Sequence, residues 1–110
     1  MKDFIKEFKR DITSYGKEHY TACEKETNID DIYRQETLIC ERGKILYNCF
    51  EVRDSTTYQA SGIVSNDVEQ FLKLPISEIE SMCNVIYHYS LVEVEEWNNH
   101  KLWQNMTTTH

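Results

Sequence analysis

The longest stretch of the chain without Gly or Pro, residues 76–110, begins with apolar residues at helical spacing. One helical stripe recurs at intervals of three and four and consists of Ile79, Met82, Cys83, Ile86, Ser90, Val94 and Trp97. Pro75 disfavours a helix before it, and Ser77 and Glu80 have the spacing of a capping box. We therefore predict the main helix within 76–103, continuous from Ser77 to Trp97, with an end or a bend at Asn98.

A strand competes with this helix in its second half. Residues 85–94 are rich in β-branched and aromatic side chains, and Tyr87, Tyr89 and Leu91 alternate as they would in a strand. The capping signal and the lack of turn residues favour the helix.

The first residues predict a second amphipathic helix, from Asp3 to Tyr15. Phe4, Ile5, Phe8, Ile12 and Tyr15 would face inward, with charged residues between them. Gly16 is suited to the position after the last turn.

The middle of the chain is open to two interpretations. Residues 17–26 predict a short helix, with Tyr20 and Cys23 inward, and apolar residues at threes and fours predict two more, over 29–41 and 44–53. The rival interpretation makes Thr37–Glu41 and Lys44–Val52 a hairpin around Arg42-Gly43.

Residues 54–65 show no helical period and are rich in Ser and Thr. They form either a long loop or one strand, and as a loop they would be a candidate contact segment. Ser65-Asn66-Asp67 then caps a short helix predicted over Val68–Leu74.

Turn residues decide the predicted fold class. The chain has 110 residues but three Gly and one Pro, and a sheet-rich domain needs more of them at its turns. We predict an all-α fold, a single domain over residues 1–110 with five or six helices. The alternative is an α+β fold with a small hairpin sheet near 37–64.

The composition also predicts a compartment. No run approaches the roughly 18 apolar residues of a membrane span, and the first residues have no apolar core of a secretory signal. A cytoplasmic protein is expected, without contact with a membrane. Its cysteines, Cys23, Cys40, Cys49 and Cys83, are then expected to be free thiols.

Charge is unevenly distributed. The net charge is −7, and residues 1–53 hold 11 acidic and 10 basic side chains, whereas residues 54–110 hold 8 and 2. A surface of this sign repels nucleic acid and attracts a basic protein. Direct binding to nucleic acid is therefore not expected.

Catalytic and metal chemistry find little support in the spacing of the residues. His19 and Cys23 would share a helix face at i,i+4, the one arrangement that resembles a base beside a thiol or a pair of metal ligands. No CxxC pair, glycine-rich phosphate loop or nucleophile elbow accompanies them. We expect no catalytic residue, cofactor or metal. A small enzyme or metal-binding protein that uses His19 and Cys23 is the alternative.

Acidic and aromatic side chains together suggest a partner-binding surface in the second half of the chain. Aromatic residues anchor protein interfaces and charges speed encounter. The candidate residues are Asp67, Glu69, Glu78, Glu80, Tyr87, Glu93, Glu95, Glu96 and Trp97.

In size, charge and expected location the chain resembles bacterial immunity proteins that neutralise nuclease toxins, including those of contact-dependent inhibition systems. The resemblance implies an inhibitor that plugs the basic cleft of a nuclease toxin, and it transfers no individual residue. A phage anti-defence protein that mimics DNA is an alternative with the same electrostatics.

Overall fold

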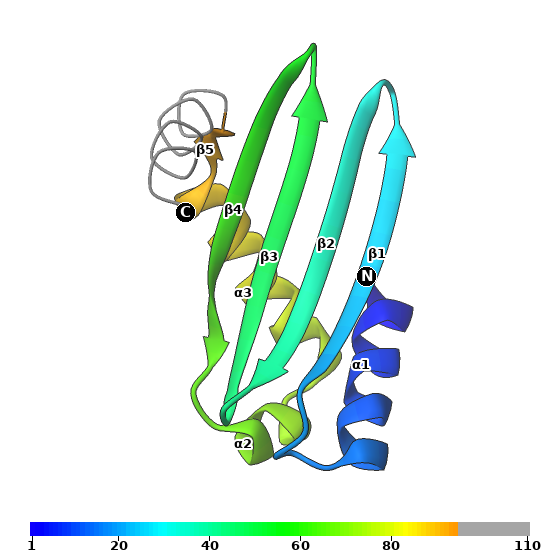
Figure 1. The fold of residues 1–110 in the computed structure, drawn as a ribbon, viewed down its shortest axis with the longest axis vertical. Coiled ribbons are helices and arrows are strands. Elements are labelled where there is room, and N and C mark those ends of the chain that lie inside the picture. Colours follow the sequence, from blue (N-terminus) through cyan, green and yellow to red (C-terminus); the bar gives the residue numbers. More distant parts are fainter. Residues whose placement is uncertain (95–110) are drawn as a thin grey trace, which may run out of the picture.

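The computed structural model describes residues 1–94. Two longer helices, one short helix and five strands follow one another along the chain (Figure 1). They are α1 (Lys2–Tyr15), β1 (Thr21–Ile29), β2 (Ile32–Glu41), β3 (Lys44–Arg53), β4 (Thr56–Ser65), α2 (Val68–Lys73), α3 (Ile76–Ser90) and β5 (Val92–Glu93).

The strands form one antiparallel sheet in the order β1-β2-β3-β4-β5. The first four strands are a meander of long hairpins, and β5 pairs with β4 through Tyr58 and Gln59 alone. Helices α1 and α3 lie on the same face of this sheet, α1 behind β1 and α3 behind β3 and β4 (Figure 1). We call this the covered face. No described helix lies on the other face, which we call the open face.

The core lies between the two helices and the covered face. Phe4, Ile5, Phe8 and Ile12 of α1 are buried, which confirms the inward side predicted for that helix except at exposed Tyr15. They form one cluster with Ile79 and Cys83 of α3 and with side chains of every long strand, and Phe8 packs edge-on against Phe71 of α2. Such burial gives roughly 1.5–3 kcal/mol per large side chain.

Helix α3 approaches the sheet closely at one glycine. A Cβ atom at Gly62 of β4 would lie 3.0 Å from Cγ2 of Ile86. The close approach of Ile86 to β4 at this point therefore depends on the absence of a side chain at Gly62.

The predicted all-α fold is wrong. The segments predicted as helices over 17–26, 29–41 and 44–53 contain β1, β2 and β3, and the undecided segment 54–65 contains β4. The helical period was misleading because β3 has apolar side chains on both faces: Ile45 and Tyr47 on one, Leu46 and Phe50 on the other. A strand of that kind has no alternation of polar and apolar residues, so pairs of adjacent apolar residues imitate a helix.

The shortage of glycine was the second cause of this error. Each hairpin turns on two residues with positive φ, as a type I′ turn requires, but Gly43 fills just one of the six positions. The others are Asp30, Asp31, Arg42, Asp54 and Ser55. Non-glycine residues at the turns thus allow a sheet-rich domain with three glycines.

The main helix is shorter than predicted. It begins at Ile76 after Pro75, without a side-chain cap from Ser77, and ends at Ser90, before β5. The continuous helix to Trp97 is therefore wrong, because it is interrupted over residues 91–93, and residues 95–103 lie outside the described residues. Over Val68–Leu74 the prediction was nearly right, because α2 ends one residue earlier, at Lys73.

Among the described residues, no helix is both long and apolar enough to cross a membrane.

Candidate functional site

The predicted acidic residues lie in separate places. Asp67 and Glu69 stand at the start of α2, where Oδ1 of Asp67 accepts hydrogen bonds from the backbone N–H groups of Glu69 and Gln70. Asp67 therefore caps the helix, as the sequence predicted. Its carboxylate is exposed but has a structural role.

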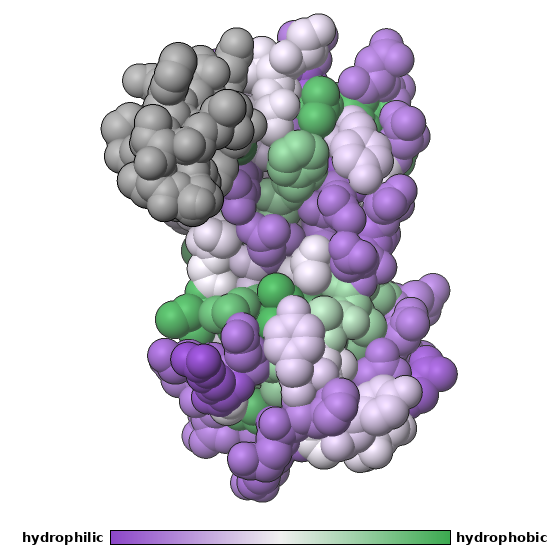
Figure 2. Space-filling view, in the orientation of Figure 1, coloured by the Kyte–Doolittle hydropathy of each residue, from purple (hydrophilic) through white to green (hydrophobic). Residues whose placement is uncertain are grey.

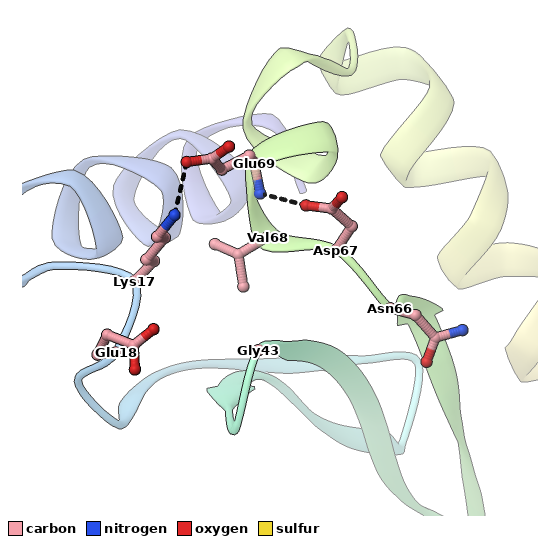
Figure 3. Close-up of a pocket in the computed structure, with 7 residues that line it drawn as sticks. All are labelled: Lys17, Glu18, Gly43, Asn66, Asp67, Val68 and Glu69. Atoms are coloured by element: carbon pink, nitrogen blue, oxygen red, sulfur yellow. Dashed lines mark hydrogen bonds and ion pairs between the residues drawn. The ribbon is translucent and has the colours of Figure 1, made fainter.

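Glu69 also has a partner within the chain. Its Oε1 lies 2.6 Å from Nζ of Lys17 (Figure 3). This contact lowers the pKa of Glu69 and raises that of Lys17. Both side chains are exposed, so water screens the pair and leaves it little weight in stability.

The remaining predicted acids follow α3. Glu78 and Glu80 are at its start, Glu93 is beyond its end in β5, and the 15 residues of the helix span roughly 20 Å between them. Glu95, Glu96 and Trp97 lie outside the described residues. Within residues 1–94 the predicted acids thus form two pairs, at the starts of α2 and α3, with Glu93 apart from both, so the structure does not bring them together as one patch.

A small pocket lies at the α2 end of the molecule, between α2, the β2–β3 turn and the segment after α1 (Figure 3). Its volume is about 210 Å³, and its lining includes Lys17, Gly43 and the exposed acids Asp67 and Glu69. Because Lys17 is already paired with Glu69, the pocket has no free cation among residues 1–94 to hold an anion.

Tyr87, one of the two aromatic residues predicted for the partner-binding surface, points into the molecule. Its hydroxyl donates to the carboxylate of Glu51, at 2.9 and 3.0 Å from the two oxygens. Glu51 is only 1% exposed and also faces Nε of Arg34 at 2.8 Å and Nε of Arg53 at 2.6 Å. Burial and the bond to Glu51 raise the pKa of Tyr87. Its hydroxyl is therefore engaged within the chain.

Each of the two arginines around Glu51 also packs against an aromatic ring. The guanidinium of Arg34 lies 4.5 Å from the centre of the Tyr87 ring, and that of Arg53 lies 4.4 Å from the Tyr58 ring. The N–H at Nε of Arg53 is buried and not aligned for a hydrogen bond, so its contact with Glu51 is an ion pair alone. This cluster occupies the covered face at the end of the sheet that bears the β3–β4 turn.

The proposed pairing of His19 with Cys23 on one helix has lost its structural basis. Cys23 is in β1, and its Sγ donates to Oδ2 of Asp11 at 3.3 Å, while His19 stacks on Tyr15. Ligand atoms of Glu7, Asp11 and Cys23 lie within 4.8 Å of one another. Burial and Asp11 raise the pKa of Cys23 to about 12, which disfavours the thiolate that a metal or a nucleophilic reaction requires.

The open face has an unusual composition. Ile39, Leu46 and Ile63 stand side by side on β2, β3 and β4 as cross-strand partners, and Phe50 and Val52 follow on β3. Figure 2 views this face and shows a hydrophobic band across the sheet, with a smaller apolar group toward the β3–β4 turn. Ile63 is 51% exposed. An antiparallel sheet with one covered face normally directs polar side chains to the other.

Carboxylates border this apolar surface on β1. Glu24 and Glu26 point to the open face, where Glu24 accepts a hydrogen bond of 2.8 Å from Gln35 of β2. Glu41, near the end of β2, is a third acid on the face, and Lys44 is the one basic residue among the outward strand positions. Three acids against one base give the open face a negative charge.

The apolar surface continues around the edge of β4. A shallow groove of about 300 Å³ lies between β4 and α3 and is lined by Ile63, Val64, Met82, Val85 and Ile86, with Ser81 at its border. Val85 is 55% exposed. Because β5 pairs only with Tyr58 and Gln59, β5 leaves this part of the edge free.

This surface is not visible when the middle of the chain is interpreted as helices. The helical period places Ile39, Leu46 and Phe50 on the inner side of helices, and Ile63 falls in the undecided segment 54–65. The rival hairpin over 37–53 contained the signal, because in a strand the outward positions 46, 50 and 52 are all apolar.

Neither a family model nor a curated protein nor a solved structure matches this chain.

Proposed function

We propose that this chain is an acidic cytoplasmic binding protein that docks on a basic surface of another protein and blocks it. The open face of the sheet is the docking surface in this proposal. Inhibition, not catalysis, is the activity. The partner chemistry that suits it best is that of a nuclease toxin, as in the immunity proteins that the chain resembles in size and charge.

One observation carries the proposal: an apolar surface with an acidic border lies on a face that no described element covers. Protein interfaces combine apolar anchors at the centre with polar groups around them. Phe50 and Leu46 would be the anchors, and Glu24 and Glu26 would meet lysines or arginines of the partner.

Charge determines the kind of partner. The chain has a net charge of −7, and the acids away from the open face, such as Glu78 and Glu93, add to the field that a partner meets on approach. A basic protein is attracted by this field and an acidic one is repelled. A nuclease presents a basic cleft because its substrate is a polyanion.

The test compares two aromatic residues on different elements. Wild-type protein, Phe50→Ser and Tyr89→Ser are each immobilised and exposed to lysate of the native host, and the bound proteins are identified. Tyr89 is the control because it is 87% exposed on α3, away from the open face. We expect a basic protein that wild type and Tyr89→Ser retain and that Phe50→Ser binds at least about tenfold more weakly.

Two further measurements tie this partner to the proposed function. The association rate should fall as salt rises, and more so for wild type than for the double variant Glu24→Gln with Glu26→Gln. A partner with nuclease activity should lose it on addition of one equivalent of the chain. An acidic partner, or equal retention by Phe50→Ser and wild type, would refute docking through the open face.

A further inference from the structure

The two borders of the sheet differ in charge. At one border, β1 carries Glu24, Lys25 and Glu26 in a row. At the other, β4 beyond Tyr58 and Gln59 has no strand on its outer side within residues 1–94. Among the described helices and strands, β4 alone has no Asp, Glu, Lys or Arg, although 28% of the chain is charged. Edge strands usually carry charges that prevent pairing with another chain, so β1 is protected in this way and β4 is not.

The backbone of Ile63 faces this free edge of β4. The N–H of Ser61 points outward, where it donates to Oγ of Ser90 at 3.1 Å. Because backbone groups along a strand alternate in direction with a period of two residues, the N–H and C=O of Ile63 also point outward. The register with β3 shifts only after Ile63, before Ser65. The edge therefore offers a donor and an acceptor in regular strand geometry.

Apolar side chains flank this backbone on both faces of the sheet. On the open face Ile63 is exposed, and Figure 2 shows the hydrophobic band reaching the β4 side of the molecule. On the covered side, the groove between β4 and α3 places Met82 and the exposed Val85 beside the edge. Residues 81–90 of α3 also contain no Asp, Glu, Lys or Arg. The uncharged surface thus extends over the strand and the helix.

Charge indicates what this surface binds. A contact across a two-fold axis places each residue near the axis opposite its own copy, so a charged residue there would meet a like charge. Two copies with a net charge of −7 each can therefore approach closely only where carboxylates are absent. The uncharged surface meets this condition, and it offers a basic or an acidic partner no charge to recognise.

We propose that the free edge of β4 and the adjoining side of α3 form the interface of a dimer with a second copy of this chain. A two-fold axis passes beside Ile63, so that Ile63 of each copy donates its N–H to the C=O of Ile63 of the other. The two sheets then continue as one, and Val85 of one copy packs near Val85 of the other. Both open faces stay uncovered, so the dimer does not depend on the proposed function.

Sedimentation velocity of the full chain at roughly 1–500 μM tests for this dimer. The contact is confined to one edge, so we expect a weak dimer with a Kd of roughly 10–100 μM. Higher salt should tighten it, because salt screens the repulsion between two acidic copies, whereas it slows association with a basic partner. A monomer at every concentration would overturn the proposal.

Three variants at exposed positions locate the interface. Val85→Glu and Val85→Lys should each weaken the dimer at least about tenfold, because like charges then meet across the axis. An equimolar mixture of the two should restore it, since opposite charges then face each other. Ile29→Glu, at an exposed residue of the β1 border, is the matched control and should leave the dimer unchanged. A dimer that Val85→Glu does not weaken, or that the mixture does not restore, would refute this interface.

Discussion

Toward the β3–β4 turn, the two faces of β3 exchange their usual roles. Near the β2–β3 turn, Ile45 and Tyr47 are buried on the covered face, as an antiparallel sheet under helices requires. Toward the β3–β4 turn, Glu51 and Arg53 point to the covered face, while Phe50 and Val52 point to the open one. Hydrophobic burial organises one end of the sheet, and an ion cluster organises the other.

This exchange distinguishes the arrangement that would best stabilise the fold from the one that is observed. If folding alone were selected, Glu51 and Phe50 would exchange places, because each would then be in its preferred medium. A buried ion cluster gives little net stability compared with apolar packing, and an outward phenylalanine gives less than an inward one. The exchange is explained if the outward apolar side chains bind another protein, as we propose.

The largest expected effect concerns two buried thiols in the core beneath the covered face, those of Cys23 and Cys83. Burial raises the pKa of Cys83 to about 12, and burial with Asp11 raises that of Cys23 to the same value. At pH 8 these thiols should react with iodoacetamide about a thousandfold more slowly in the folded protein than in urea, where the pKa is about 8.5. Mass spectrometry of the alkylated peptides over time gives both rates. Similar rates in both states would mean that water reaches this core.

The next largest effect concerns the ion cluster. Glu51→Ala leaves Arg34 and Arg53 without their shared carboxylate and should lower the free energy of unfolding by about 3 kcal/mol. That is the low end for a buried pair, because the arginine side chains are 36% and 38% exposed and can turn to water. Urea denaturation measures the change, with Glu78→Gln as the exposed control. A loss below about 0.5 kcal/mol would show that the cluster does not organise its end of the sheet.

Adjacent residues of β3 give a direct comparison of the two faces. Ile45→Ala removes a fully buried side chain from the covered face and should cost about 3 kcal/mol, whereas Leu46→Ala on the open face should cost about 1. The expected difference is thus about 2 kcal/mol in urea denaturation. Equal costs would mean that the open face is covered in solution, and its availability to a partner would be disproved.

The sequence predicted the ends of this fold better than its centre. Helix α1 and the Asp67 cap of α2 were found because each depends on local signals, an apolar stripe and a capping side chain. The sheet was missed because β-pairing joins distant residues and β3 is apolar on both faces. Only part of the candidate site could be anticipated: the negative charge was visible, but which acids stand beside exposed apolar residues depends on strand register.

The smallest expected effect tests the hairpin turns, in which non-glycine residues adopt positive φ. Ser55 has φ of 66° in the β3–β4 turn, a conformation that costs an L-residue about 1 kcal/mol and glycine little. Ser55→Gly should therefore stabilise the chain by about 0.5 kcal/mol, once the greater freedom of unfolded glycine is subtracted.

Gly43→Ala is the matched opposite of this change. Gly43 has φ of 78°, and a Cβ there would meet no atom within 4 Å, so the expected loss of about 1 kcal/mol is purely conformational. Urea denaturation of both variants and of wild type shows whether each change raises or lowers the free energy of unfolding. If both changes proved neutral, backbone conformation at the turns would not limit stability, and the strand register would have to be fixed by the side chains of the two faces alone.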